Sequence, residues 1–217
     1  MIDKVEIGRR IREQNAGPVE ALSCKQFGLK QIGGSRTKID GEHLVDGTRW
    51  SIKNAASRST QVHLTTKKKF TFDFQLNELQ QEFVNKFFGD QSFTHMPRQR
   101  YKMDEIDPEA VESFKAFLEM NKEEFIRYVV CGRDNINYVV YNSAVLNTQQ
   151  IMERCKDAHW VYNNTAIHLK SPDGKSFFHI QMKGSGKGAT YHGVLCHIHE
   201  HLFKQREIKC KHGKISY

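Results

Sequence analysis

The chain has 217 residues and a formal net charge of +8, and 38% of its residues are hydrophobic, 11% aromatic and 27% charged. This is the composition of a globular protein, without internal repeats or low-complexity tracts. No apolar run is long enough to span a membrane, so we expect no membrane partner, and the excess of positive charge favours a polyanion, most simply nucleic acid.

The expected cellular location follows from the first residues and the cysteines. Met1 to Lys4 lead directly into a charged segment, so we expect no signal peptide. The five cysteines are scattered and odd in number, which argues against a disulfide framework. A reducing cytoplasm is therefore the expected location.

Two helices are predicted before the first strands. Residues 3–14 have the pattern of a basic amphipathic helix. Gly17-Pro18 then starts a second helix, from Val19 to Phe27, because proline suits a first helical turn. This second helix carries Glu20, and residues 28–35 are predicted to be a loop.

Residues 36–54 predict a hairpin, because Asp46-Gly47 is a strong signal for a two-residue turn between extended segments. In that register Asp40 faces Lys53 and Glu42 faces Ser51. Side chains alternate along a strand, so one face collects four polar residues, Asp40, Glu42, Ser51 and Lys53. The other face, with Ile39, Trp50 and Ile52, is predicted to enter a core.

This polar face suggests a magnesium site. Mg²⁺ prefers oxygen ligands and usually takes one or two carboxylates together with waters and substrate phosphate. A lysine beside it can orient water or stabilise charge on a phosphate under attack. The alternative is a solvated polar face of an exposed hairpin, in which an Asp–Lys pair contributes little to stability.

Further elements follow in the middle of the chain. Residues 62–66 and the alternating Phe70, Phe72 and Phe74 predict strands. Three cations between them can contact a DNA backbone or form a charged turn: Lys67, Lys68 and Lys69.

Helices are predicted next. Residues 76–88 have helical spacing, with Gly89 as a cap, and a further helix begins with Asp107 as N-cap and Pro108 in the first turn. It is followed by helices over 122–130 and 148–155 and a strand over 137–141. The loop 90–107 mixes basic and aromatic residues, a mild signal for DNA contact that includes Arg98 and Arg100.

The last third is rich in predicted antiparallel strands: 160–162, 166–170, 177–183 and 194–198. Ser171 to Gly174 predicts a turn between two of them. The glycine-rich stretch after the third strand is either a flexible hairpin loop or a DNA-binding loop, with Gln181 or Ser185 reading base edges and the lysines on phosphate. The candidates for DNA contact here are Gln181, Lys183, Ser185, Lys187 and His192.

Histidines and cysteines gather near the C-terminus, and His197 and His199 share one strand face. Histidine and cysteine are zinc ligands, but the spacing of a zinc finger is missing from this group. Histidines that face DNA or solvent are the favoured interpretation.

Asp40, followed after a turn by Ser51-Ile52-Lys53, resembles the PD-(D/E)XK nuclease motif. Ser51 departs from that motif, which has an acid at this position. The resemblance implies that Asp40 binds metal, that Lys53 assists the chemistry, and that Glu42 or Glu20 replaces the missing acid. Gln61 is a weaker site candidate. The Gln-x-Lys-Gly stretch from Gln181 resembles the C-terminal part of small restriction enzymes.

The resemblance implies an α/β fold, a mixed central sheet flanked by helices with a helical middle insertion. We expect one endonuclease domain over 1–217, divided into 1–75, 76–157 and 158–217. The expected function is Mg²⁺-dependent, sequence-specific cleavage of double-stranded DNA, as by a type II restriction endonuclease. Such enzymes often act as homodimers, and a homodimer is a possible arrangement here. The alternatives are a phage homing endonuclease of the same chemistry and a DNA-binding protein without catalysis.

Overall fold

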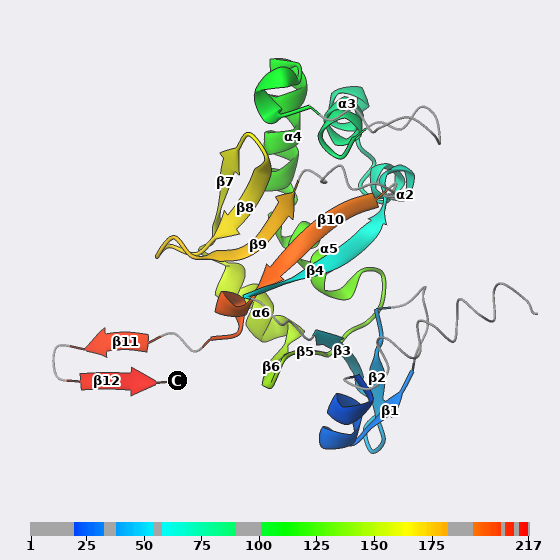
Figure 1. Ribbon diagram of the computed structural model, residues 1–217, viewed down its shortest axis with the longest axis vertical. Helices are drawn as coiled ribbons and strands as arrows, with labels where there is room; N and C mark the ends of the chain where they lie inside the picture. The colour runs from blue at the N-terminus through cyan, green and yellow to red at the C-terminus, as the bar shows by residue number, and fades with distance from the viewer. Residues whose placement is uncertain are drawn as a thin grey trace, which may run out of the picture. The chain divides into compact units, whose positions relative to one another are not determined.

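The computed structural model describes residues 20–32, 38–53, 58–89, 101–181, 193–204, 207–210 and 213–216, with the backbone alone for His63 and the last two ranges. The predicted helix over residues 3–14 lies outside these ranges. The fold is α/β, as predicted (Figure 1). No helix in the described ranges is long and apolar enough to cross a membrane.

The chain forms two compact units, and each unit is built from two separate segments. Unit 1 comprises Met1–Ala56 and Val130–Ile151, and unit 2 comprises Ser57–Val129 and Met152–Tyr217. Each unit has its own five-stranded sheet.

The sheet of unit 1 is mixed and has the strand order β1-β2-β3-β5-β6. β2 is antiparallel to both β1 and β3, β5 runs parallel to β3, and β6 is antiparallel to β5. The strands are β1 (Leu29–Gln31), β2 (Gly41–His43), β3 (Arg49–Lys53), β5 (Tyr138–Tyr141) and β6 (Ala144–Asn147).

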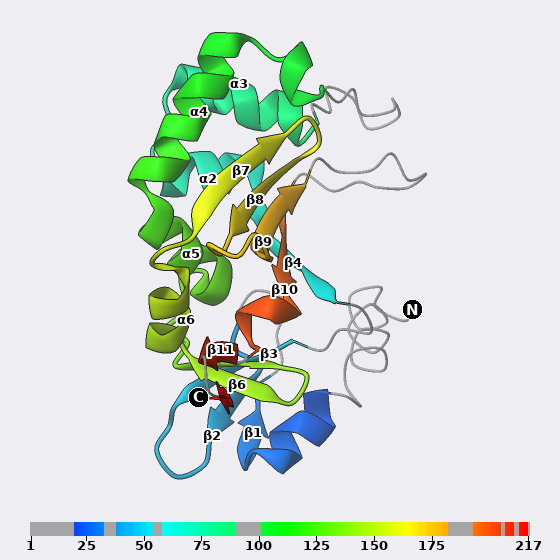
Figure 2. The same ribbon diagram turned by 90° about the vertical axis from the view of Figure 1, so that its left-hand side faces the viewer.

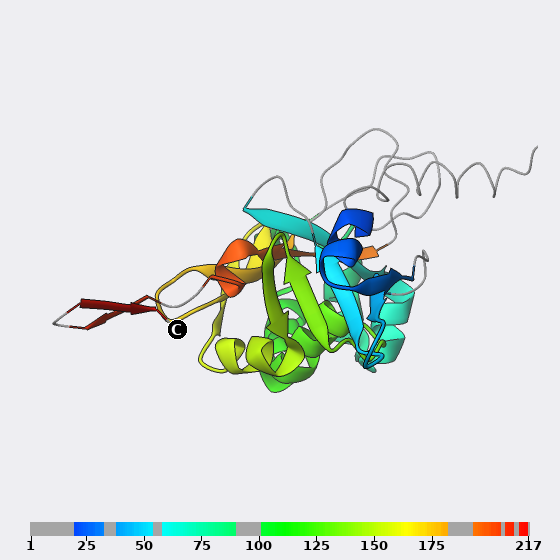
Figure 3. The same cartoon turned by 90° about the horizontal axis from the view of Figure 1, so that it is seen from below.

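A helix that covers residues 20–26 packs on this sheet (Figure 3). Its Cys24 joins Leu29, Ile52 and Val140 in a buried cluster. Gly41 allows the close approach, because a Cβ atom there would lie 3.1 Å from Leu29 and 3.2 Å from Cys24 Sγ. Partly buried aromatic and aliphatic side chains complete the cluster: Phe27, Trp50 and Val145.

The hairpin between β2 and β3 forms, but its predicted register is wrong by two residues. Gly41 pairs with Trp50, and Glu42 pairs with Arg49. The turn is longer than two residues because the Asp46 carboxylate accepts hydrogen bonds from the backbone N and the hydroxyl of Thr48, at 2.9 and 2.8 Å. A shift of two residues conserves the alternation of faces, so Ile52 and Trp50 still point to the core.

The segment predicted as a loop over 28–35 contains a strand, β1. It has only three residues and pairs with β2 at the edge of the sheet. Three residues are too few for an alternating hydrophobic pattern to be visible in the sequence. Strand β6 was also not predicted; its backbone pairs with β5 along all four residues.

The sheet of unit 2 is antiparallel and has the order β4-β10-β9-β8-β7. All the strands predicted over 62–66 and in the last third are present, and the turn from Ser171 connects β8 and β9. The strands are β4 (Ser59–Thr66), β7 (His159–Asn163), β8 (Ala166–Lys170), β9 (Ser176–Gln181) and β10 (Gly193–His199). A separate hairpin consists of β11 (Glu207–Cys210) and β12 (Gly213–Ser216).

The start of α4 follows its predicted capping signal. Asp107 caps this helix by accepting from Glu109 N, with Pro108 in the first turn. Asn77 forms a capping box at the start of α3, a cap that was not predicted. The helices are α2 (Lys67–Asp73), α3 (Glu78–Phe87), α4 (Pro108–Met120), α5 (Lys122–Cys131) and α6 (Thr148–Cys155), with short 3-10 helices η1 (Met103–Glu105) and η2 (Glu200–Leu202).

The strand predicted from Phe70, Phe72 and Phe74 is wrong, because these residues lie in and at the end of α2. Thr66 caps this helix by accepting from Lys69 N. Phe70 and Phe74, four residues apart, share one helical face and pack on Phe117, whereas Phe72 is 76% exposed. The alternation of these three aromatic residues therefore does not mark a strand, since only Phe70 and Phe74 belong to the buried face of the helix.

The core of unit 2 lies between its sheet and the helices. Figures 1 and 2 show α4 and α5 along one face of this sheet. Trp160 of β7 contacts Phe125 of α5 edge-on, and its ring nitrogen donates to the carbonyl of Leu118 at 3.1 Å. The opposite face of the sheet carries polar side chains, among them His168, His179 and His197.

Candidate active site

Asp40 is the centre of a polar group in unit 1. One of its oxygens, Oδ2, accepts three hydrogen bonds, from Ser51 Oγ at 3.1 Å, Ile52 N at 2.6 Å and Lys53 Nζ at 3.2 Å. All three donors lie on β3, and the backbone N of Asp40 donates to Trp50 O on the same strand. The carboxylate is therefore held in one orientation, and none of the contacts described for it falls on Oδ1.

Lys53 forms an ion pair with Asp40 that is largely shielded from water. The two side chains are 18% and 19% exposed. Partial burial lowers the effective dielectric constant, so a charge here acts more strongly on its surroundings than at the surface. The same burial holds the ammonium group in a defined place at the end of β3.

Ser51 occupies the position at which the nuclease motif has its second acid, and its side chain is fully buried. Its hydroxyl donates to Asp40 Oδ2, which satisfies the hydrogen-bonding need of a buried polar group. In this structure Ser51 is therefore a support for Asp40 and offers no negative charge.

Glu20 approaches the same group from the helix over residues 20–26. Burial raises its pKa, and the negative charge of Asp40 raises it further, while Lys53 lowers it. The charges of Asp40 and Lys53 thus both act on Glu20. The sequence alone could not establish that these three residues are close. A second carboxylate beside Asp40 is costly unless a cation lies between them.

Cys24 belongs to this group and was not predicted. Its thiol lies 3.9 Å from the backbone oxygen of Asp40, and burial, then Asp40 and Glu20, raise its pKa. The thiol is therefore protonated at neutral pH and a poor nucleophile. Its spacing of four residues from Glu20 was the available signal, since such residues share a helical face.

No contact described for the other predicted catalytic residues reaches Asp40 or Lys53. Glu42 lies two residues from Asp40 on the same strand face, where the register sets it opposite Arg49 and Lys30. Gln61 belongs to unit 2, where it lies on β4 opposite His197 and is exposed.

Few of the predicted DNA contacts can be placed. Lys67 donates to Gly89 O and Lys69 pairs with Asp73, while Lys68 is exposed on α2. Gln181 is exposed at the end of β9. The remaining candidates lie outside the described residues: Arg98, Arg100, Lys183, Ser185, Lys187 and His192.

The residues present suit magnesium in kind. Asp40 and Glu20 offer hard carboxylate oxygens, and magnesium is commonly held by one or two carboxylates together with waters. Within the described ranges no three His, Cys, Asp or Glu side chains form a complete ligand set. A metal here would therefore depend on water and substrate oxygens for most of its coordination.

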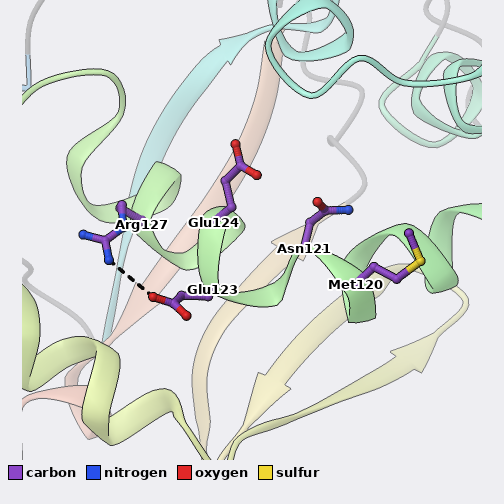
Figure 4. Close-up of a pocket in the computed structure, with 5 residues that line it drawn as sticks. All are labelled: Met120, Asn121, Glu123, Glu124 and Arg127. Carbon is purple, nitrogen blue, oxygen red and sulfur yellow. Dashed lines mark hydrogen bonds and ion pairs between the residues drawn. The ribbon is translucent and has the colours of Figure 1, made fainter.

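A pocket of about 330 Å³ lies elsewhere, at the junction of α4 and α5 in unit 2 (Figure 4). Its lining includes an ion pair between Glu123 and Arg127, at 3.4 Å. The other lining residues are Met120, Asn121 and Glu124. None of the candidate catalytic residues lines it, and its side chains indicate no particular ligand.

No protein-family model matches this sequence, and no curated protein matches it.

Proposed function

We propose that the chain is a Mg²⁺-dependent, sequence-specific endonuclease that hydrolyses phosphodiester bonds in double-stranded DNA, with a fold and site of the PD-(D/E)XK type. The observation that carries the proposal is the group formed by Asp40, Lys53 and Glu20. Asp40 is oriented by three donors, Lys53 is shielded from water beside it, and the charges of both act on Glu20, which gives two carboxylates and a lysine in one group.

Each side chain has a separate task in this proposal. Asp40 and Glu20 hold the metal, which stabilises charge on the phosphate and activates water when it is bound. Lys53 orients the water or stabilises the negative charge that develops on the phosphate. Ser51 keeps Asp40 in position through its hydrogen bond.

The topology of unit 1 supports the same assignment. The helix with Glu20 precedes three antiparallel strands, and β5 adds to the sheet parallel to β3. Asp40 and Lys53 thus lie on neighbouring segments of a mixed α/β sheet, as the resemblance to restriction endonucleases implies. The net charge of +8 suits a DNA substrate, and a homodimer suits a palindromic site.

A DNA-binding protein without catalysis is the second candidate, and one observation favours it. Ser51 is fully buried where the motif has an acid, so only Asp40 and Glu20 remain as carboxylates of the group. The two candidates share DNA binding and differ in cleavage. A homing endonuclease differs from a restriction enzyme only in its biological role and its recognition site.

The test is digestion of supercoiled plasmid by the purified full chain, with Mg²⁺ and with EDTA. We expect Mg²⁺-dependent nicking or linearisation, followed by defined ends on sequencing. Asp40→Asn and Lys53→Met should each lower the cleavage rate by a factor of about 100 or more, because a transition-state contact is lost.

The matched control is Lys30→Met, which removes an exposed lysine from β1 of the same sheet. It should cleave like the wild type. If the wild type binds DNA but never cleaves it with Mg²⁺ or Mn²⁺, the non-catalytic candidate replaces the endonuclease. If Lys53→Met is fully active, the assignment of this group is wrong.

A further inference from the structure

A row of histidines crosses the face of the unit 2 sheet that lies opposite its core. The register pairs His168 with His179 and His179 with His197, on the neighbouring strands β8, β9 and β10. His199 shares this face because it follows His197 by two residues. The residues that alternate with these histidines are buried in the core: Ile167, Leu169, Phe178, Ile180, Cys196 and Ile198.

The imidazole rings are in direct contact. Nδ1 of His179 lies 2.6 Å from Nε2 of His199, and the rings of His179 and His197 are stacked with their centroids 4.3 Å apart and 8° between their planes. Two imidazole nitrogens at that distance share one hydrogen at most. At least one of these two nitrogens therefore directs a lone pair at the other ring.

The four imidazoles of the row are partly buried, which shields them from bulk water. Imidazole nitrogens are common ligands of first-row divalent metals.

We propose that His179, His197 and His199 form a binding site for a divalent transition metal, in the first instance zinc. Two of these ligands stand two residues apart on one strand, and the third is on the adjacent antiparallel strand. Imidazole suits zinc, and three histidines with one open position filled by water are an established zinc coordination. The site does not depend on the proposed nuclease activity.

Metal binding requires small movements of the rings. Two nitrogens on one tetrahedral zinc lie about 3.3 Å apart, given Zn–N bonds of about 2.0–2.1 Å, so the His179–His199 pair opens by less than about 1 Å. His197 must turn out of its stack, because no three side chains within the described ranges converge as they stand. The sequence placed only His197 and His199 on one strand face. The third ligand, His179, joins them through the pairing of β9 with β10.

The experiment uses the full chain, stripped of metal by a chelator and dialysed. Zn²⁺ is titrated against a chromophoric chelator, and Co²⁺ is added separately as a spectroscopic probe. We expect one Zn²⁺ per chain with micromolar or tighter affinity, a rise in Tm, and visible Co²⁺ absorption. His179→Ala and His199→Ala should each weaken binding by more than about tenfold, since even a partner that only supports a ligand is worth 10- to 100-fold.

Two control variants separate this site from others. His159→Ala removes an exposed histidine from β7 of the same sheet, opposite Lys170, and should bind zinc like the wild type. Asp40→Asn should also retain binding, which excludes the carboxylate group of unit 1. Should the alanine variants lose their far-UV circular dichroism, His179→Gln and His199→Gln take their place.

The proposal is overturned if the wild type takes up no zinc at micromolar concentrations. It is also overturned if the variants of His179 and His199 bind as tightly as the wild type. Equal loss in Asp40→Asn would assign the zinc to unit 1 instead.

Discussion

Two glutamates are candidates for the second acid of the proposed metal site. The charges of Asp40 and Lys53 act on the pKa of Glu20, whereas Glu42 stands opposite Arg49 in the register of β2 and β3. Removing one carboxylate of a metal site weakens metal binding, so Glu20→Gln should need far more Mg²⁺ for half-maximal cleavage. Glu42→Gln should give the wild-type Mg²⁺ titration.

The measurement is the cleavage rate as a function of Mg²⁺ concentration for both variants and the wild type. A reversed result, with Glu42→Gln impaired and Glu20→Gln normal, would assign the second acid to the strand. Two normal titrations would mean that Asp40 acts without either glutamate.

At the scale of elements, the turn between β2 and β3 fixes which residues meet. Hydrogen bonds from the backbone and hydroxyl of Thr48 lower the pKa of Asp46 below its usual 3.8. A lowered carboxyl pKa in the folded state means that this contribution to stability is complete above pH 3.8 and is lost as the pH falls through the folded value. We expect the carboxyl carbon of Asp46 to titrate below 3.8 by NMR.

The control for that titration is Thr48→Val, which removes one of the two donors while it conserves the side-chain volume. The pKa of Asp46 should rise toward 3.8 in this variant. A value at or above 3.8 in the wild type would contradict the turn described for residues 43–48.

The elements show what local sequence could and could not predict. The cap formed by Asp107 acts within one helical turn, so the start of α4 was accessible from the sequence. The hairpin register depended on the Asp46–Thr48 bonds, which compete with the two-residue turn that Asp-Gly favours. Phe70 and Phe74 needed their partner Phe117, which is distant in the sequence, before the helix could be distinguished from a strand.

The polar group around Asp40 and the row of histidines were also only partly predictable from local sequence. Asp40 and Lys53 were predicted as neighbours because they lie on adjacent segments of one hairpin, and the two-residue shift kept them on one face. Cys24 and His179 were not identified, because each meets its group only through packing of a helix on a sheet or through pairing of distant strands.

At the scale of the whole molecule, the division into two units has a consequence for sequence analysis. The chain leaves unit 1 after Ala56, returns at Val130 and leaves again after Ile151. The sheet of unit 1 therefore pairs β3 with β5, strands more than 80 residues apart in sequence. Hydrophobic periodicity is local and cannot show such a parallel pairing.

The proposed binding to DNA should depend on salt, because each lysine or arginine on a phosphate releases counterions and the chain has a net charge of +8. Of the three lysines at the start of α2, Lys67 and Lys69 have partners within the chain and Lys68 is exposed. Lys68→Ala should therefore weaken binding to cognate and random DNA alike. It should reduce the slope of log K against log salt by about one unit.

Binding is measured in Ca²⁺ and EDTA over a series of salt concentrations, on cognate and random duplexes. Lys156→Ala, which removes an exposed lysine just after α6, is the matched control for the loss of one positive charge. A phosphate contact changes the slope for Lys68→Ala alone, whereas a general effect of net charge changes affinity equally in both variants. Equal changes would exclude α2 from the proposed DNA-binding surface, and the basic residues Arg98 and Arg100 would be the next to test.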